Sequence, residues 1–215
     1  MRQNPNPYYD FYWVLNKTFQ LAGIESFLDL GCATGWLLYY LKQNYPEIFV
    51  QGIEYFEFHK DAAHNLIQES IDILDLRDEI NLHRKFDIIN STEVGEHIDP
   101  AFTSVYMQNL KNHCRKFLIL SWGNTGGAND RKRDPHLQHL NPLSFEEVSK
   151  LCCENGFKLD ELKTKELVYY SKRAPKIKLA KGILPVLRRK LGLNFDQVDG
   201  FYPWWRSSLS VWVPQ

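Results

Sequence analysis

The sequence predicts an α/β domain in which helices cover both faces of a mostly parallel β-sheet. Short apolar runs alternate along the chain with segments whose apolar residues recur at helical spacing. This alternation favours parallel strands joined by helices. A glycine-rich turn links the first apolar run to a helix, and a cluster of ionisable residues follows a later run. With 215 residues and no internal repeat, residues 1–215 are expected to form one domain.

Local patterns justify the elements of the first half of the chain. A leading helix is predicted because apolar side chains recur at helical spacing at Phe11, Val14, Leu15 and Phe19. The strands are apolar runs too short for helices, and Pro46 ends the second helix because it disfavours helical backbone in the preceding residue. The expected helices cover 7–22, 35–43 and 59–69, and the expected strands cover 27–30, 48–53, 71–76 (or a turn) and 86–91.

The second half shows clearer boundaries. A helix is expected to begin at Asp99, an N-cap residue followed by Pro100 at the first helical position. A strand over 116–120 follows, and then a helix that a capping box over 144–147 opens and Gly156 ends. Residues 201–213 are expected to contain the last strand, with Trp204 and Trp205 as packing residues. Two segments interrupt the alternation, a polar loop over about 123–143 and a basic insertion over about 172–199.

Composition narrows the class of protein. The 26 cations balance the 26 anions, so a general attraction to nucleic acid is not indicated. No apolar run reaches the roughly 20 residues of a membrane span, and residues 1–5 lack the apolar core of a signal peptide. The four cysteines follow neither a zinc nor a secreted disulfide spacing, which predicts a reduced, cytoplasmic protein.

The turn over 29–35 carries the clearest chemical signal. Small residues stand at every second position, Gly31, Ala33 and Gly35, whereas a dinucleotide fingerprint requires G-x-G-x-x-G. Asp29 precedes the first glycine, and its carboxylate favours a cationic ligand over a pyrophosphate. The spacing therefore counts against a dinucleotide-dependent oxidoreductase and favours a cofactor that carries positive charge.

A second signal lies where a buried strand ends. Glu93, Glu96 and His97 follow the run over 86–91, and ligands bind α/β sheets at the carboxyl ends of their strands. On a helical turn these three side chains share one face, which suits the chelation of a metal ion. A metal-free role, with His97 as general base, and solvated surface charge remain alternatives.

Together the two motifs resemble those of class I S-adenosylmethionine (SAM) methyltransferases, over about residues 10–165 and the last strand. The resemblance implies a Rossmann-like, mostly parallel seven-stranded sheet with one antiparallel strand. It also implies SAM as cofactor, with Glu54 on the ribose hydroxyls and Asp75 and Leu76 at the adenine. The other implied cofactor contacts are Asp29, Gly31, Cys32, Ala33, Gly35 and Ser91.

The E-x-x-E-H segment also resembles ubiquinone-biosynthesis O-methyltransferases and metal-dependent small-RNA 2′-O-methyltransferases. In the RNA enzymes both glutamates, the histidine and a later histidine bind Mg²⁺, and the metal binds two neighbouring hydroxyls of the acceptor. The resemblance implies that a divalent metal, Mg²⁺ or Mn²⁺, is bound by four residues that are also catalytic, with His136 as a reserve ligand. These residues are Glu93, Glu96, His97 and His139.

The acceptor is expected to be a hydroxyl beside another hydroxyl, with a sugar or glycan preferred. An RNA 2′-hydroxyl and a catechol-type small molecule remain alternatives, and a non-catalytic SAM-binding module is disfavoured by the intact turn. The basic segment over 172–190 is either a peripheral contact for an anionic partner or a solvated helix. Trp122, which ends the fifth strand, either lines the acceptor pocket or belongs to the core.

Overall fold

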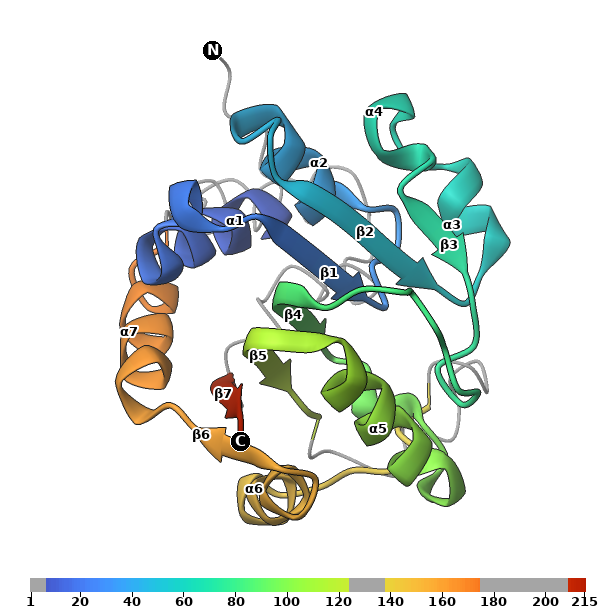
Figure 1. Ribbon diagram of the computed structural model, residues 1–215, viewed down its shortest axis with the longest axis vertical. Coiled ribbons are helices and arrows are strands. Elements are labelled where there is room, and N and C mark those ends of the chain that lie inside the picture. The colour runs from blue at the N-terminus through green and yellow to red at the C-terminus, as the bar shows by residue number, and fades with distance from the viewer. Residues whose placement is uncertain (1–6, 124–137, 175–208) are drawn as a thin grey trace, which may run out of the picture.

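A seven-stranded sheet forms the centre of the protein (Figure 1). The computed structural model describes residues 7–123, 138–174 and 209–215. The strand order is β3-β2-β1-β4-β5-β7-β6, and β7 runs antiparallel to both of its neighbours, while β1 to β5 pair in parallel. The strands are β1 (Ser26–Leu30), β2 (Phe49–Glu54), β3 (Ile71–Ile73), β4 (Phe86–Thr92), β5 (Cys114–Ser121), β6 (Phe157–Leu159) and β7 (Ser210–Pro214). The predicted fold class is thus confirmed.

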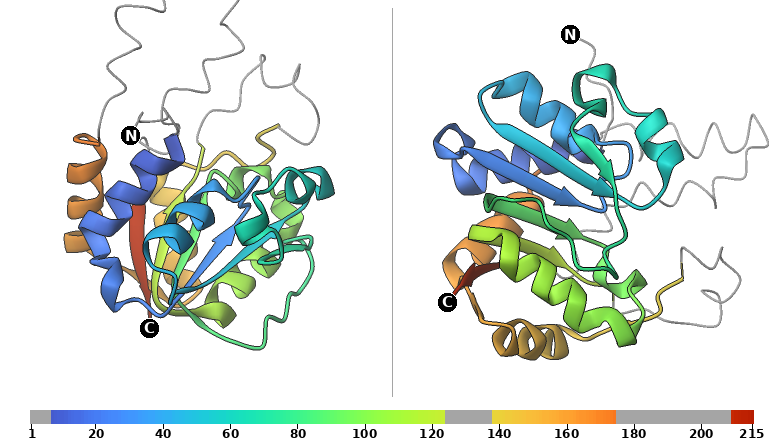
Figure 2. Two further views of the ribbon diagram at one scale, coloured as in Figure 1. Left: turned by 90° about the horizontal axis from the view of Figure 1, so that it is seen from above. Right: turned by 45° about the vertical axis from the view of Figure 1, so that its right-hand side comes forward.

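Helices cover both faces of the sheet, and an apolar core fills each layer (Figure 2). On one face α1, α2, α4 and α7 share an apolar core with β1, which includes Phe27 and Leu38. On the other face α5 and α6 pack through Tyr106, Leu110 and Cys152. The helices are α1 (Pro7–Phe19), α2 (Trp36–Asn44), α3 (Glu57–Asp61), α4 (Asn65–Gln68), α5 (Thr103–His113), α6 (Phe145–Glu154) and α7 (Glu161–Ser171).

The order in which strands are added to the sheet reverses between β1 and β4. The strands β1, β2 and β3 follow one another toward one edge of the sheet. Strand β4 then pairs with the opposite side of β1. Asp29 lies opposite Asn90 in this pairing, and Thr92 lies opposite Ser121 in the pairing of β4 with β5. Ligands of α/β sheets bind outside the carboxyl ends of the strands at such a reversal. The segments after β1, β2, β4 and β5 therefore define the region of interest.

The predicted helix boundaries hold where a cap defines them. The Asp99 side chain accepts a hydrogen bond from Ala101 N at 2.9 Å, although the first turn there is a 3₁₀ helix, Pro100–Phe102. Both reciprocal bonds of the capping box at Ser144 are present. Gly156, with a φ of 74°, follows the end of α6.

The structure corrects one predicted helix and adds one strand and one helix that were not predicted. The expected helix over 59–69 is wrong, because it is split into α3 and α4. His64 interrupts it with extended backbone, φ −67° and ψ 138°, and its ring nitrogen accepts a bond from Leu66 N as the cap of α4. The structure also adds β6 and α7, which the periodicity did not predict.

Several sequence predictions lie outside the described residues. They are the reserve ligand His136, Trp204 and Trp205, most of the polar loop and the basic insertion beyond residue 174. Among the described helices, none has the length and apolar character required to cross a membrane.

Candidate active site

The glycine turn is held in an unusual backbone conformation between β1 and α2. Gly31 and Gly35 both have a φ of 70°, and Ala33 has a φ of 48°. Gly31 N and Cys32 N both donate to the carbonyl oxygen of Ile53, at 2.8 and 3.1 Å, which ties the turn to the end of β2. A Cβ on Gly35 would lie 2.6 Å from the Ile67 side chain. The turn therefore needs glycine for its left-handed backbone and for its packing.

Glu54, the last residue of β2, connects the turn to the next strand. Its Oε2 accepts a hydrogen bond from Ala33 N at 2.8 Å, and its Oε1 accepts one from Phe56 N at 3.0 Å. The His59 Nδ1 lies 3.2 Å from Oε1. An ionised carboxylate offers about four acceptor positions, so Glu54 retains capacity for the hydroxyls of a ribose.

Asp29 is a buried carboxyl group at the end of β1. Its side chain accepts a hydrogen bond from Asn90 Nδ2 at 2.7 Å, directly across the strand pair. Burial raises the pKa of Asp29 from 3.8 to about 7; the Asn90 bond lowers it, and the charge of Glu54 raises it further. The other amide atom of Asn90, Oδ1, is buried without a hydrogen-bond partner in the described part of the chain. This end of β1 and β4 thus presents oxygen acceptors that a cationic group would satisfy.

Glu93, Glu96 and His97 are brought together, but not on a helix as expected. Glu93 has a left-handed φ of 56°, and residues Gly95–His97 form a 3₁₀ turn. Ser121 holds Glu93 from the neighbouring strand, because its hydroxyl accepts from Glu93 N at 3.0 Å and donates to Glu93 Oε1 at 2.7 Å. A Cβ on Gly95 would lie 2.3 Å from the Trp122 ring, so the turn rests directly on that indole. The predicted helical face is wrong, and the tight packing over Trp122 is the physical reason.

Glu96 is the more deeply buried of the two carboxylates, Glu93 and Glu96. It is fully buried, and neither carboxylate oxygen has a hydrogen-bond partner among the described residues. Burial and the neighbouring charge of Glu93 raise the pKa of Glu96 to about 8. Burial likewise raises the pKa of Glu93, against the lowering effects of Ser121, Glu96 and His139. A buried carboxylate without a partner is costly unless a cation or a proton neutralises it.

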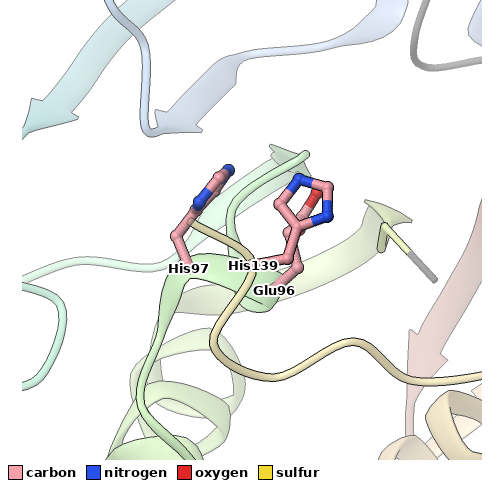
Figure 3. A group of neighbouring side chains, drawn as sticks. All are labelled: Glu96, His97 and His139. Carbon is pink, nitrogen blue, oxygen red and sulfur yellow. The ribbon is translucent and has the colours of Figure 1, made fainter. Parts of the chain in front are cut away.

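Two imidazoles complete the cluster. One ligand atom each from Glu96, His97 and His139 lies within 4.8 Å of the others, and Figure 3 shows the three side chains pointing to the same side. The His97 Nδ1 lies 3.0 Å from the carbonyl oxygen of Gln138. Since a carbonyl only accepts, Nδ1 carries the hydrogen, so in the neutral imidazole Nε2 carries the lone pair. The predicted fourth member, Glu93, adjoins Glu96 but is not part of this three-residue group.

The remaining predicted residues have other partners in the structure. Asp75 is paired with Arg77, whose Nε donates to both carboxylate oxygens at 2.9 Å and holds the pKa of Asp75 below its usual range. Leu76 is buried in the core. Ser91 is fully buried, with its hydroxyl 2.6 Å from that of Tyr106. The buried Cys32 thiol lies beneath the turn, where a Cβ on Gly52 would be 2.5 Å from its sulfur. Their contacts with a cofactor stay predictions.

Trp122 belongs to the core rather than to an open pocket. It is only 1% exposed, and its Nε1 donates to the carbonyl oxygen of Asn141 at 2.6 Å.

Sequence reasoning also missed Tyr8, which α1 brings near the turn. Burial, with the charges of Asp29, Cys32 and Glu54, raises the pKa of Tyr8 to about 12. An aromatic residue on a leading helix carries no sequence signal that links it to a turn more than 20 residues away.

Comparisons with known proteins agree with the fold. A family model described as a methyltransferase domain matches residues 14–162. No curated protein sequence matches the chain. The O-methyltransferase of a trans-AT PKS multienzyme from Brevibacillus brevis, solved with S-adenosyl-L-homocysteine, is 16% identical with a TM-score of 0.57, over 95% of this chain and 70% of that one.

Two further solved structures share the fold. The plantazolicin methyltransferase BpumL, solved with a triazolic desmethylPZN analog and SAH, is 14% identical with a TM-score of 0.60, over 100% of this chain and 86% of that chain. The methyltransferase domain of bacterial CtHen1-C is 18% identical with a TM-score of 0.53, over 73% of this chain and 87% of that chain. At these identities the likeness concerns the fold alone.

Proposed function

Since the chain belongs to the methyltransferase domain family and is a SAM-dependent methyltransferase, we propose that it methylates a hydroxyl of a vicinal diol with the help of a divalent metal. The observation that carries the proposal is the buried cluster of Glu96, His97 and His139. It follows β4, which pairs in parallel with β1, so the cluster and the glycine turn both lie beyond the carboxyl ends of these strands.

The residues of the cluster fit a divalent cation. Both oxygens of Glu96 are buried without a hydrogen-bond partner in the described chain, so a cation would supply the missing compensation. The bond from His97 Nδ1 to Gln138 leaves Nε2 as the ligand atom, a typical support for a metal-binding histidine. We propose that Glu96, His97 and His139 bind the cation and that Glu93 contributes negative charge. Mixed oxygen and nitrogen ligands suit Mn²⁺ or Fe²⁺ better than Mg²⁺.

The other end of the site fits SAM. We propose that Asp29 neutralises the α-ammonium group of the cofactor and that Glu54 accepts hydrogen bonds from the ribose. The burial that raises the pKa of Asp29 supports this role, because a buried carboxyl needs a cationic partner to remain ionised at neutral pH. SAM supplies an electrophilic methyl group on a positively charged sulfur.

The reaction forms a carbon–oxygen bond as the carbon–sulfur bond breaks, which leaves S-adenosylhomocysteine, and the proton of the acceptor hydroxyl passes to solvent water. If Glu96, His97 and His139 held a divalent cation, it would lower the pKa of a bound hydroxyl, as it does for water. Holding the acceptor oxygen in line with the methyl group and the sulfur contributes several orders of magnitude more. In the metal-free alternative, Nε2 of His97 accepts the proton as general base.

A sugar or glycan is the acceptor class that we propose first. Two neighbouring hydroxyls on a sugar ring can both reach one cation, and an uncharged acceptor suits a chain with 26 cations and 26 anions. An RNA 2′-hydroxyl and a catechol are the competing acceptors, and a panel of all three distinguishes them.

The test is methyl transfer from radiolabelled SAM to this panel, with and without chelator. We expect turnover of one acceptor class to be lost in EDTA and restored by Mn²⁺ or Mg²⁺. Turnover that is insensitive to EDTA would reject the metal and favour His97 as base. Calorimetry with SAM, and with NAD as control, tests the cofactor separately, and the absence of SAM binding would reject the whole proposal.

A further inference from the structure

A short segment, the strap (residues 138–141), carries His139 to the cluster. Figure 3 shows His139 arriving from a separate stretch of chain, while Glu96 and His97 stand on the turn after β4. Two hydrogen bonds fasten the strap on either side of His139. Gln138 O accepts from His97 Nδ1 at 3.0 Å, and Asn141 N donates to Glu96 O at 2.9 Å. The distance between His139 and Glu96 thus depends on how the strap is fixed.

Asn141 fastens the strap to three separate parts of the protein. Besides the bond to Glu96, its carbonyl oxygen accepts from Trp122 Nε1 at 2.6 Å. Its side-chain Nδ2 donates to the hydroxyl of Thr103, the first residue of α5, at 2.9 Å. Asn141 is only 8% exposed, so water replaces these bonds poorly. Hydrogen bonds to three separate parts of the protein fix the strap at this residue.

We propose that Asn141 is a positioning residue that holds His139 at coordinating distance from Glu96, an inference that rests on the proposed metal site. Metal sites need their ligands placed within about 0.5 Å, and ligands on loops are placed less accurately than those on helices or strands. Glu96 and His97 share the 3₁₀ turn Gly95–His97, whereas His139 lies in a segment without regular secondary structure. The side-chain bond from Asn141 to Thr103 makes the position of the strap depend on the rigid helix α5.

The test measures the affinity of the full-length protein for Mn²⁺ alone, by calorimetry. Removing either end of the side-chain bond, with Asn141→Ala or Thr103→Val, is expected to weaken Mn²⁺ binding about 10-fold, the low end for residues that orient metal ligands. Combining the two changes should cost no more than either alone, because they remove the same bond. Thr103→Ser retains the hydroxyl and should restore the affinity. SAM affinity should stay unchanged in every variant.

Asn155→Ala is the matched control. Like Asn141, Asn155 donates one hydrogen bond from its side-chain amide. Its acceptor is the carbonyl oxygen of Leu151, at 2.8 Å, at the end of α6. We expect this change to lower the melting temperature and leave Mn²⁺ affinity unchanged. If Thr103→Val binds Mn²⁺ as tightly as the wild type, the positioning role is refuted while the metal site stands. If the wild type binds no Mn²⁺, both the metal site and the positioning role are refuted.

Discussion

Replacing Asp29 with asparagine should stabilise the protein at neutral pH while weakening its binding of SAM. Asp29 is 4% exposed, and burial raises its pKa from 3.8 to about 7. That increase of about 3 pH units corresponds to about 4 kcal/mol, at 1.36 kcal/mol per unit, by which the folded state disfavours the ionised form. Asparagine is nearly isosteric and its carbonyl still accepts from Asn90. We therefore expect Asp29→Asn to raise the free energy of unfolding by about 2–4 kcal/mol at pH 8.

The effect should disappear at low pH, and its sign follows from proton binding. Below about pH 4 Asp29 is protonated in both the folded and the unfolded wild type, so the neutral amide offers no advantage. Between about pH 4 and 7 the unfolded state ionises while the folded state retains its proton, and the wild type loses stability as the pH rises. Above about pH 7 both states are ionised and the difference between variant and wild type stays constant.

Urea unfolding of both proteins at intervals between pH 4 and 8.5 measures this difference directly. The other ionisable groups are common to the two proteins, so their contributions largely cancel. A difference in unfolding free energy that does not change with pH would refute the assignment of Asp29 as a buried, destabilising carboxyl. A variant that binds SAM as tightly as the wild type would refute its role as partner of the ammonium group. Stability lost for the sake of a binding site is a common compromise in enzymes.

Three further changes test separate parts of the structure. Glu54→Gln should weaken SAM binding about 10-fold by calorimetry without affecting Mn²⁺ affinity, since a neutral amide is a weaker acceptor for ribose hydroxyls; equal SAM affinity would contradict the ribose role. Gly95→Ala should lower stability by about 1–3 kcal/mol in urea unfolding, because its Cβ would lie 2.3 Å from the Trp122 ring, whereas Gly23→Ala meets nothing within 4 Å and should be tolerated. Ser144→Ala should cost about 1 kcal/mol in the same assay through loss of the capping box at α6, and an unchanged midpoint would contradict that cap.

The parts of the fold that the sequence predicted are those that depend on local chemistry. The alternation of apolar runs and helical segments was enough to predict a parallel sheet, and the caps at Asp99 and Ser144 act through residues two or three positions away. Asp29 was recognisable because it precedes the glycine turn, and Glu54 because it closes a strand; parallel strands end at one edge of the sheet. That these two residues lie close together can be predicted without knowing the path of the rest of the chain.

The cluster geometry depends on contacts that local patterns do not contain. The spacing of Glu93, Glu96 and His97 suits a helical face, but the structure has a 3₁₀ turn instead. Two contacts impose it: Gly95 packs against the Trp122 ring, and the Ser121 hydroxyl accepts a hydrogen bond from Glu93 N. Both contacts come from Ser121, the last residue of β5, and from Trp122, which follows it; Ser121 is 28 residues later in the chain than Glu93. Asn90 was missed for a similar reason, because its partner Asp29 is 61 positions away.

Strand β4 connects the two halves of the site. Near its end, Asn90 contacts Asp29 of β1, where we propose that the cofactor's ammonium group binds. Three residues later, Glu93 is held by Ser121 of β5, at the start of the cluster. Extended backbone advances about 3.3 Å per residue, so about 10 Å of rigid sheet separates the two halves. If the ammonium group binds at Asp29 as we propose, the sheet sets its distance from the cluster. Among the described segments, the strap alone brings a cluster residue, His139, from outside β4 and the turn that follows it. Accurate placement of the acceptor then depends on how the strap is fastened, which is why we expect the Asn141 bonds to matter more for metal binding than for folding.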